Sequence, residues 1–293
     1  MSAIALYGPL LVTVTMWAFQ APAMHALGDR WDFASLTLIR YLIAAAAFAA
    51  IALVMSAPAR RLPVLRGLQL GGLFAGFGVL YALGAVVGNP VVSATAGAVM
   101  PLTASLVTWA LTGQRPARPL LLALLLVVPG AVLATPAPEG NGGDRPVIGL
   151  ALVMTAQVCW SLYSLSVPRW MPEASSIART RLSVLWAMPW HGVVFALAWG
   201  AGFGIFEPVA GDAAIVLVAA LGPLVLGVAL WNLSVARLGL PVAALALNLV
   251  PVIGALIAWG FGSPPTAVQM AGVALVIAGM GWAQARRRDL PEP

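Results

Sequence analysis

Carboxylates, the groups that most often carry protons inside a membrane, are missing from the interior of every long apolar segment of this sequence. All nine lie in predicted loops, at segment ends or in the tail: Asp29, Asp32, Glu139, Asp144, Glu173, Glu207, Asp212, Asp289 and Glu292. Proton-coupled membrane pumps commonly use an intramembrane acid. Any proton-linked step in this chain would therefore need another group, and we expect a proton gradient alone to drive little.

Other reactive side chains are scarce. The chain has one cysteine, Cys159, and two histidines, His25 and His191, with no metal-ligand spacing around them. A disulfide framework, a four-cysteine metal site and a His-Glu-x-x-His set are thereby excluded. There is no lysine, so the Walker loop of an ATP-driven pump is absent. We expect no catalytic residue, no metal and no cofactor, and we reject an intramembrane enzyme.

Arg40 is the one basic residue clearly inside an apolar segment, about two turns from its end. One interpretation is an arginine whose head group reaches the membrane surface. The other is a counter-charge or a helix-packing anchor at the wall of a cavity. A site for doubly charged phosphate esters would need several such cations, so phosphate-ester exchange is less favoured.

Aromatic and hydrogen-bonding side chains occur together within the apolar segments. Trp17 precedes Gln20, and Trp160 precedes Tyr163, each by one helical turn. A ring beside a hydrogen-bonding group on one helix face suits a solute with a ring and polar ends, although core packing is the alternative. We take as candidate binding residues Trp17, Gln20, Tyr81, Met100, Trp160, Tyr163, Trp231 and Asn248.

Two prolines fall at the middle of apolar segments. Pro101 and Pro251 lack an amide hydrogen for the carbonyls of Gly97 and Leu247, four residues earlier. A broken helix at mid-membrane is tolerated where it is buried in protein or lines a wet cavity. We expect a matched pair of kinks that frames a site, with an ordinary kink as the alternative.

The composition is that of a membrane protein. Of 293 residues, 61% are hydrophobic and 8% charged, against about 45–50% apolar and 25% charged in soluble domains. Fifteen arginines give a net charge of +6 without a basic block longer than three, so a nucleic-acid partner is not expected. A membrane helix needs about 20 apolar residues. We expect an all-α protein with ten spans, near 5–27, 34–55, 67–87, 91–112, 119–135, 147–168, 178–200, 213–235, 241–261 and 266–285.

Arginine placement predicts the orientation, because arginines concentrate in cytoplasmic loops. With the N-terminus inside, the outer loops contain only Arg30 and Arg145. The inner loops and the C-terminus then contain Arg60, Arg61, Arg66, Arg115, Arg118, Arg169, Arg179, Arg181, Arg237 and Arg286–Arg288. Both termini are therefore expected in the cytoplasm.

The chain also repeats itself. An offset of 150 aligns Pro101 with Pro251 and Tyr81 with Trp231, and an offset of 141 aligns Arg40 with Arg181. We expect a first repeat at 1–135, a linker at 136–146, a second repeat at 147–285 and a basic tail at 286–293. Five spans per repeat is an odd number, so the second copy enters the membrane inverted. Inverted repeats characterise secondary transporters with a midplane site.

Several of these segments resemble the EamA domains of the drug/metabolite transporter superfamily. The resemblance lies in Trp17-Ala18-Phe19, Gln157–Tyr163, Arg40-Tyr41, Arg181-Leu182 and the Ala-rich runs into Pro101 and Pro251. It covers nearly the whole chain, and the Trp-rich segments are most similar to the aromatic amino acid exporter branch. The resemblance implies inverted five-helix repeats, a central cavity and efflux across a bacterial inner membrane.

We therefore expect a secondary transporter that exports neutral or zwitterionic small metabolites, aromatic and other amino acids first, by alternating access. Its partners are expected to be the small-molecule substrate and the lipid bilayer. A monomer fits the sequence. The alternatives are export of other metabolites or drugs, exchange of phosphate esters or nucleotide sugars, and a channel-like pore.

Overall fold

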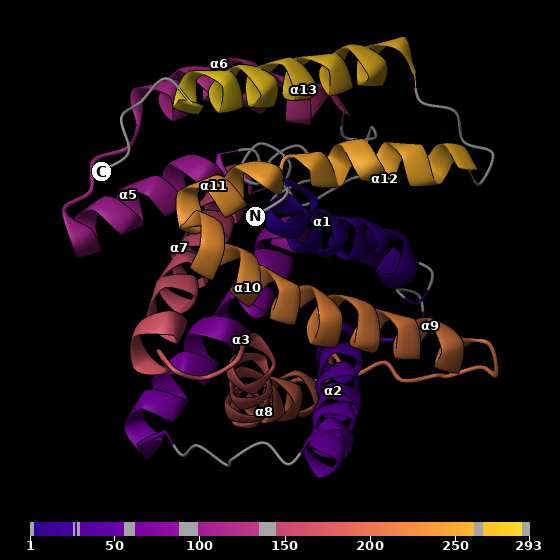
Figure 1. The fold of residues 1–293 in the computed structure, drawn as a ribbon. Helices are drawn as coiled ribbons and strands as arrows, with labels where there is room; N and C mark the ends of the chain where they lie inside the picture. The colour runs from indigo at the N-terminus through magenta and orange to yellow at the C-terminus, as the bar shows by residue number, and fades with distance from the viewer. Residues whose placement is uncertain are drawn as a thin grey trace. The chain divides into compact units, whose positions relative to one another are not determined.

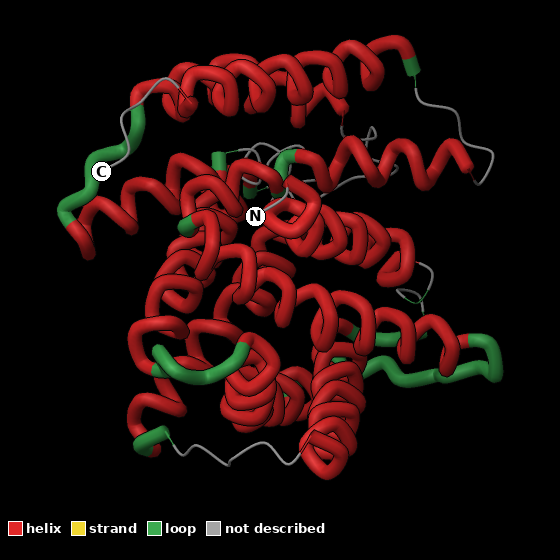
Figure 2. Tube along the Cα trace, viewed as in Figure 1, coloured by secondary structure: helices red, strands yellow, loops and turns green. Residues whose placement is uncertain are grey.

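The structure, a computed structural model, describes residues 3–25, 27, 30–55, 62–87, 99–134, 145–260 and 266–288. These residues form helices (Figures 1 and 2), with one isolated β-bridge between Trp31 and Phe206. The helices are α1 (Ala3–His25), α2 (Phe33–Met55), α3 (Val64–Val87), α5 (Met100–Thr112), α6 (Arg118–Ala134), α7 (Pro146–Trp170), α8 (Ser176–Gly200), α9 (Asp212–Ala220), the π-helix η1 (Leu221–Gly227), α10 (Val228–Leu238), α11 (Leu240–Ala246), α12 (Leu249–Gly260) and α13 (Ala267–Arg288).

Five of the described helical segments are long and apolar enough to cross a membrane by themselves. They are Phe33–Val54, Val64–Gly84, Val147–Trp170, Ser176–Gly200 and Asp212–Leu238. Each coincides within a few residues with a span expected from the sequence, because a continuous apolar run of this length predicts a membrane helix directly. The expectation of an all-helical membrane protein is confirmed for the described residues.

The chain forms two compact units, and each takes segments from both halves of the sequence. Unit 1 comprises Met1–Gly76 and Tyr163–Arg237, and unit 2 comprises Phe77–Leu162 and Leu238–Pro293. The unit boundaries therefore fall inside the long helices α3 and α7, so one part of each helix belongs to unit 1 and the rest to unit 2. Most of the expected linker at 136–146 lies outside the described residues.

In unit 1, α2 and α8 pack against each other along an antiparallel seam (Figure 1). At one end the indole Nε1 of Trp199 donates to Ser35 Oγ at 2.9 Å. Further along, the rings of Tyr41 and His191 lie 4.1 Å apart. Residue numbers therefore increase along α2 in the direction in which they decrease along α8, so the two helices are antiparallel.

The N-terminal part of α3 approaches α8 through glycines. A Cβ at Gly71 would lie 1.9 Å from the backbone oxygen of Trp186, so no larger residue fits there without a shift. A Cβ at Gly72 would lie 3.2 Å from the ring of Trp190, and the Nε1 of Trp190 donates to Leu68 O at 3.1 Å. Small residues allow such close packing of membrane helices.

In unit 2, α6 and α13 lie side by side along most of their length (Figure 1). Their contact again depends on glycines, since a Cβ at Gly272 would lie 2.4 Å from the amide of Ala134. A Cβ at Gly130 would likewise lie 2.8 Å from the backbone oxygen of Gly272. Val127 of α6 and Val276 of α13 are buried in two hydrophobic clusters of this unit.

Candidate functional site

The apolar segment Asp212–Leu238 of unit 1 is not a regular helix. It is α-helical in α9 and α10, with the π-helix η1 between them, and Pro223 lies within η1. Pro223 has no amide hydrogen for the carbonyl of Ala219 four residues earlier. The amide of Val228 donates to Pro223 O, five residues back, which is the π pattern. The carbonyl of Ala219 therefore lacks its usual helical donor.

Side chains from α1 and α2 donate to three carbonyls of this segment. Arg40 donates to Ala219 O from Nε at 3.1 Å and from Nη2 at 2.9 Å. Trp17 Nε1 donates to Pro223 O at 3.2 Å, and Thr13 Oγ1 donates to Gly227 O at 3.1 Å. Acceptors spaced by four residues share one helix face, so α1 and α2 bind one side of the interrupted segment.

Arg40 is 4% exposed. Its head group is therefore inside unit 1, and the interpretation of an arginine reaching for the membrane surface is wrong. The two hydrogen bonds to Ala219 O make Arg40 a helix-packing anchor between α2 and α9. The other role considered for Arg40, a counter-charge to a substrate, stays a prediction.

A second feature of unit 1 is a buried group of aromatic rings and hydroxyls. The rings of Trp17 and Trp231 lie 5.3 Å apart at an angle of 40°. Trp231 is fully buried, and its Nε1 donates to Ser164 Oγ at 3.0 Å. The ring pair, expected from the sequence only as two separate candidates, is thus joined to α7 by a hydrogen bond.

Next to this pair, three helices meet in a polar network. Tyr163 on α7 donates its hydroxyl to Ser183 Oγ of α8 at 3.1 Å. Asn232 on α10 donates from Nδ2 to the Tyr163 hydroxyl at 3.2 Å and to Thr180 Oγ1 at 3.0 Å. Tyr163 was expected as a site residue, whereas Asn232, Thr180, Ser183 and Ser164 were not. The available signal was that Asn232 directly follows Trp231 within an apolar run.

A series of ring contacts extends from this network toward α2 and α8. The ring of Tyr163 stacks on Phe74 at 4.8 Å, and Phe74 meets Tyr41 edge-on at 5.8 Å. Tyr41 in turn lies 4.1 Å from the imidazole of His191. Unit 1 therefore holds one continuous set of buried rings from α7 to α8.

Unit 2 contains the other expected ring residues. The ring of Phe77 contacts the ring of Trp160 at 4.8 Å and the ring of Tyr81 at 5.8 Å. Trp160 is buried, and one turn before it Gln157 accepts a hydrogen bond from Thr103 Oγ1 at 3.0 Å. Trp160 and Tyr81 thus share one ring cluster, and Gln157 is a buried polar group that sequence reasoning left out of the site.

The segments that contain Pro101 and Pro251 both have a helix end near the proline. Helix α5 begins at Met100, so Pro101 occupies its first turn, where a missing amide hydrogen costs nothing. The chain turns at Leu247 and Asn248 between α11 and α12. There the Leu247 carbonyl accepts from the amide of Val250 at 2.9 Å instead of from Pro251.

Asn248, one of the expected binding residues, is buried at this turn. Its Nδ2 donates to Leu245 O at 3.3 Å, so the side chain helps to satisfy the interrupted helix. Met100 is also buried. Gly97 and the side chains of Gln20 and Pro251 lie outside the described part of the structure.

The candidate residues are thus divided between the two units. Unit 1 contains Trp17, Arg40, Tyr163 and Trp231. Unit 2 contains Tyr81, Met100, Trp160 and Asn248. Within each unit they join buried clusters, and a cavity that all of them share stays a prediction. Among the described residues, His, Cys, Asp and Glu side chains do not gather in groups of three that would hold a metal ion.

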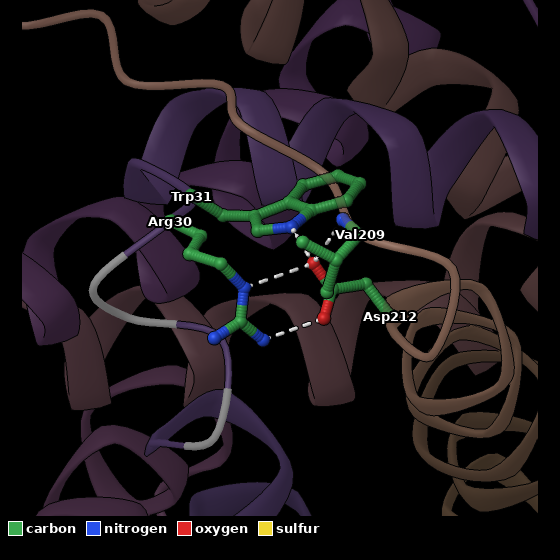
Figure 3. Close-up of polar contacts among 4 residues, drawn as sticks. All are labelled: Arg30, Trp31, Val209 and Asp212. Carbon is green, nitrogen blue, oxygen red and sulfur yellow. Dashed lines mark hydrogen bonds and ion pairs between the residues drawn. The ribbon is translucent and has the colours of Figure 1, made fainter.

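An ion pair ties the loop before α2 to the start of α9 (Figure 3). Arg30 Nη2 lies 2.6 Å from Asp212 Oδ1, and Arg30 Nε donates to Oδ2 at 3.2 Å. The same carboxylate accepts from Trp31 Nε1 at 2.8 Å and from the amide of Val209 at 3.1 Å. Asp212 is 1% exposed, and its negative charge at a helix N-terminus is favoured by the helix dipole.

Asp32 makes a second connection at the same end of unit 1. Its Oδ1 accepts from the amides of Ala34 and Ser35 at 2.8 and 2.9 Å, which caps α2. Its Oδ2 accepts from the amide of Ile205, in the loop between α8 and α9. Partial burial alone would raise the pKa of Asp32, but the hydrogen bonds from Ser35, Ile205 and Ala34 outweigh it, so the pKa lies below its ordinary value of 3.8.

The profile of the EamA-like transporter family matches this sequence twice, at residues 5–135 and 147–283. The chain belongs to the EamA family. Membership makes it a multi-pass membrane transporter rather than an enzyme, and it agrees with the apolar helices and with the resemblance noted in the sequence.

Two curated bacterial relatives of this EamA chain are transporters. It is 28% identical over 279 residues to a probable terminal-alkyne amino-acid exporter of Streptantibioticus cattleyicolor, covering 92% of this chain and 90% of the relative. It is 26% identical over 158 residues to the uncharacterized transporter YyaM of Bacillus subtilis, and that match spans about half the length of each protein.

A solved crystal structure shares the fold of the chain. The TM-score is 0.80 at 20% identity, with 99% of this chain and 100% of the other covered. At that identity the likeness concerns the fold alone.

Proposed function

We propose that this chain is a secondary exporter of neutral or zwitterionic small metabolites, with aromatic and other amino acids as its first substrates. In this proposal its two repeats are inverted five-helix units that cross a bacterial inner membrane ten times, with both termini in the cytoplasm. Alternating rearrangement around a midplane cavity would move the substrate. The amino-acid exporter among its relatives supports the substrate class.

The observation that carries the proposal is the buried set of rings and hydrogen-bonding groups in unit 1. Trp17 and Trp231 offer flat apolar faces, while Tyr163 and Asn232 offer a hydroxyl and an amide close by. This combination suits a solute with a ring at one end and polar groups at the other. In the proposed transport cycle, rearrangement of the helices brings these groups, with Trp160 and Tyr81, to the substrate.

Electrostatics support a substrate without excess charge. A site for a cationic drug is expected to contain an acidic residue inside the membrane. The sequence has no Asp or Glu between Asp32 and Glu139 or between Asp212 and Asp289. A phosphate ester would be met by several cations, whereas Arg40 is the one basic residue well inside a span. A zwitterion, with one charge of each sign, fits this environment best.

Counterflow into proteoliposomes tests the proposal. Purified protein is reconstituted, the vesicles are loaded with unlabelled substrate, and uptake of a labelled panel of amino acids, phosphate esters and cationic dyes is followed. We expect trans-stimulated exchange of amino acids, largest for Phe and Trp. Equal uptake with and without internal substrate would indicate a pore. Exchange restricted to phosphate esters or dyes would replace the substrate class proposed here.

A further inference from the structure

His191 on α8 has a buried polar atom without a partner. The side chain is 2% exposed, and its Nε2 makes no hydrogen bond within the described part of the chain. Buried polar atoms in proteins are nearly always hydrogen-bonded, and each exception calls for an explanation. His191 lies away from either end of its span, so the lipid head groups offer no partner. The missing partner therefore points to a ligand.

The surroundings of His191 indicate which ligand would fit. The imidazole lies 4.1 Å from the ring of Tyr41, and Phe74 meets that ring edge-on at 5.8 Å. These rings form an apolar wall beside the orphaned nitrogen. Arg40, the residue before Tyr41 on α2, adds a buried positive charge to this part of unit 1. The local potential is therefore positive and favours an anionic group over a cationic one.

We propose that His191 Nε2 binds the carboxylate of a zwitterionic amino-acid substrate, with Tyr41 and Phe74 as the wall against its side chain. An Nε2–H group donates to a carboxylate, and such charge-assisted hydrogen bonds are among the strong ones. In this structure His191 is buried where α2 and α8 pack together. Opening of that seam during the transport cycle would admit the substrate.

The inference rests on the proposed function, since it names the group that recognises one end of the same substrate. It also extends that function, because His191 is not among the candidate binding residues predicted from the sequence. The repeat alignment that selected Trp17, Trp160, Tyr81 and Trp231 matched aromatic positions. A lone histidine with no metal-ligand spacing gives no such signal.

The test compares L-phenylalanine with phenethylamine, which has the same ring and amine but no carboxylate. Binding of both is measured on the full-length protein in nanodiscs, for the wild type, His191→Phe and His191→Gln. We expect His191→Phe to weaken L-phenylalanine binding by about tenfold, the effect of losing one charge-assisted hydrogen bond. Phenethylamine binding should stay unchanged. His191→Gln retains an amide donor and should recover part of the loss.

Thermal unfolding without ligand separates a binding role from a structural one. His191→Phe removes an unsatisfied polar atom, so its midpoint should equal or exceed that of the wild type. Trp190→Phe, one residue away and half-exposed, is the matched control and should bind both compounds as the wild type does. Equal weakening of both compounds by His191→Phe, or wild-type binding of both, would overturn the role of His191 and leave the exporter proposal intact. If the wild type neither binds nor exchanges any amino acid, both proposals fall.

Discussion

The guanidinium of Arg40 donates two hydrogen bonds to one backbone carbonyl, that of Ala219, at 3.1 and 2.9 Å. Pro223 explains why that carbonyl needs an outside donor, because a proline four residues later supplies no amide hydrogen. The charged side chain and the proline therefore form a matched pair across two helices. An arginine buried in the membrane is expensive, and here it satisfies a helix defect that would otherwise also be costly.

The first prediction concerns this pair. Arg40→Met should lower the free energy of unfolding in detergent by about 1.5–3 kcal/mol, the value of a hydrogen bond to a charged group. Pro223→Ala returns an amide hydrogen to Ala219 O. In a double-mutant cycle followed by thermal unfolding, the Pro223→Ala background should therefore reduce the cost of Arg40→Met.

The control for this cycle is Arg181→Met. Arg181 is the residue that the repeat alignment matches to Arg40, and it is only half-buried. Its replacement should cost little in either background. Strict additivity of Arg40→Met and Pro223→Ala would show that the arginine does not serve the carbonyl that the proline leaves open.

The outcome at Arg40 illustrates what the sequence can predict. An arginine within a long apolar run is predicted to lie inside a membrane span, and the length of such runs predicts the helices. Its partner is a backbone carbonyl 179 positions away, and no side-chain pattern marks a backbone acceptor. Pro223 carried no signal either, since it has no matched proline in the other repeat.

The repeat alignment also has a limit at the level of single side chains. It pairs Arg40 with Arg181, yet the arginine that α8 buries is Arg179. Arg179 donates to Met171 O and Pro172 O at 3.0 and 2.9 Å. Two positions along a helix turn a side chain through about 200°. An alignment that pairs two spans can therefore select a residue on the wrong helix face.

A second prediction uses two glycines of α3. Gly71→Ala places a methyl group 1.9 Å from the Trp186 carbonyl oxygen, so it should separate α3 from α8 and lower the unfolding midpoint sharply. At Gly78 an added Cβ meets nothing within 4 Å. Gly78→Ala should therefore raise stability by up to about 1 kcal/mol through helix propensity. Thermal unfolding of both variants checks the opposite signs, and an equal change in both would refute the close approach.

The third prediction is a dependence of stability on pH. The pKa of Asp32 is lowered in the folded protein, so its carboxylate contributes stability above the unfolded value near 3.8. That contribution is lost as the pH falls through the folded pKa. Asp32→Asn should be less stable than the wild type near neutral pH, and the difference should shrink below about pH 4.

The matched control is Glu207→Gln, which changes an exposed carboxylate in the loop that faces Asp32. Its unfolding midpoint should follow that of the wild type at every pH. A stability gap for Asp32→Asn that stays constant from neutral pH down to pH 3 would contradict the role given to the carboxylate charge.

The fourth prediction concerns orientation, which rests on the arginine distribution. In a Cys159→Ala background, single cysteines near Arg60 and Arg115 should resist a membrane-impermeant thiol reagent in intact cells. Cysteines near Asp32 and Glu207 should react. Permeabilised cells provide the control, because all four positions should then be labelled. Protection of the second pair with labelling of the first would reverse the orientation.

The last prediction addresses the rings themselves. Stacking of an aromatic substrate on one ring is worth about 0.5–1.5 kcal/mol beyond burial, or a few-fold to about tenfold in affinity. Trp17→Ala and Trp160→Ala should therefore reduce flux of Phe or Trp more than flux of a small aliphatic amino acid. Gln20→Ala should weaken both classes equally, because its amide would bind the polar ends that all amino acids share.

The structure adds a control that separates stacking from folding. Trp17 also donates to Pro223 O, so Trp17→Ala removes a hydrogen bond together with the ring. Trp17→Phe removes the hydrogen bond and keeps an aromatic face. If the ring binds substrate, Trp17→Phe should retain the preference for aromatic amino acids at matched expression, while Trp17→Ala loses it. If both variants lower flux of both classes alike, Trp17 supports the interrupted helix and nothing more, and the substrate class would then depend on the relatives alone.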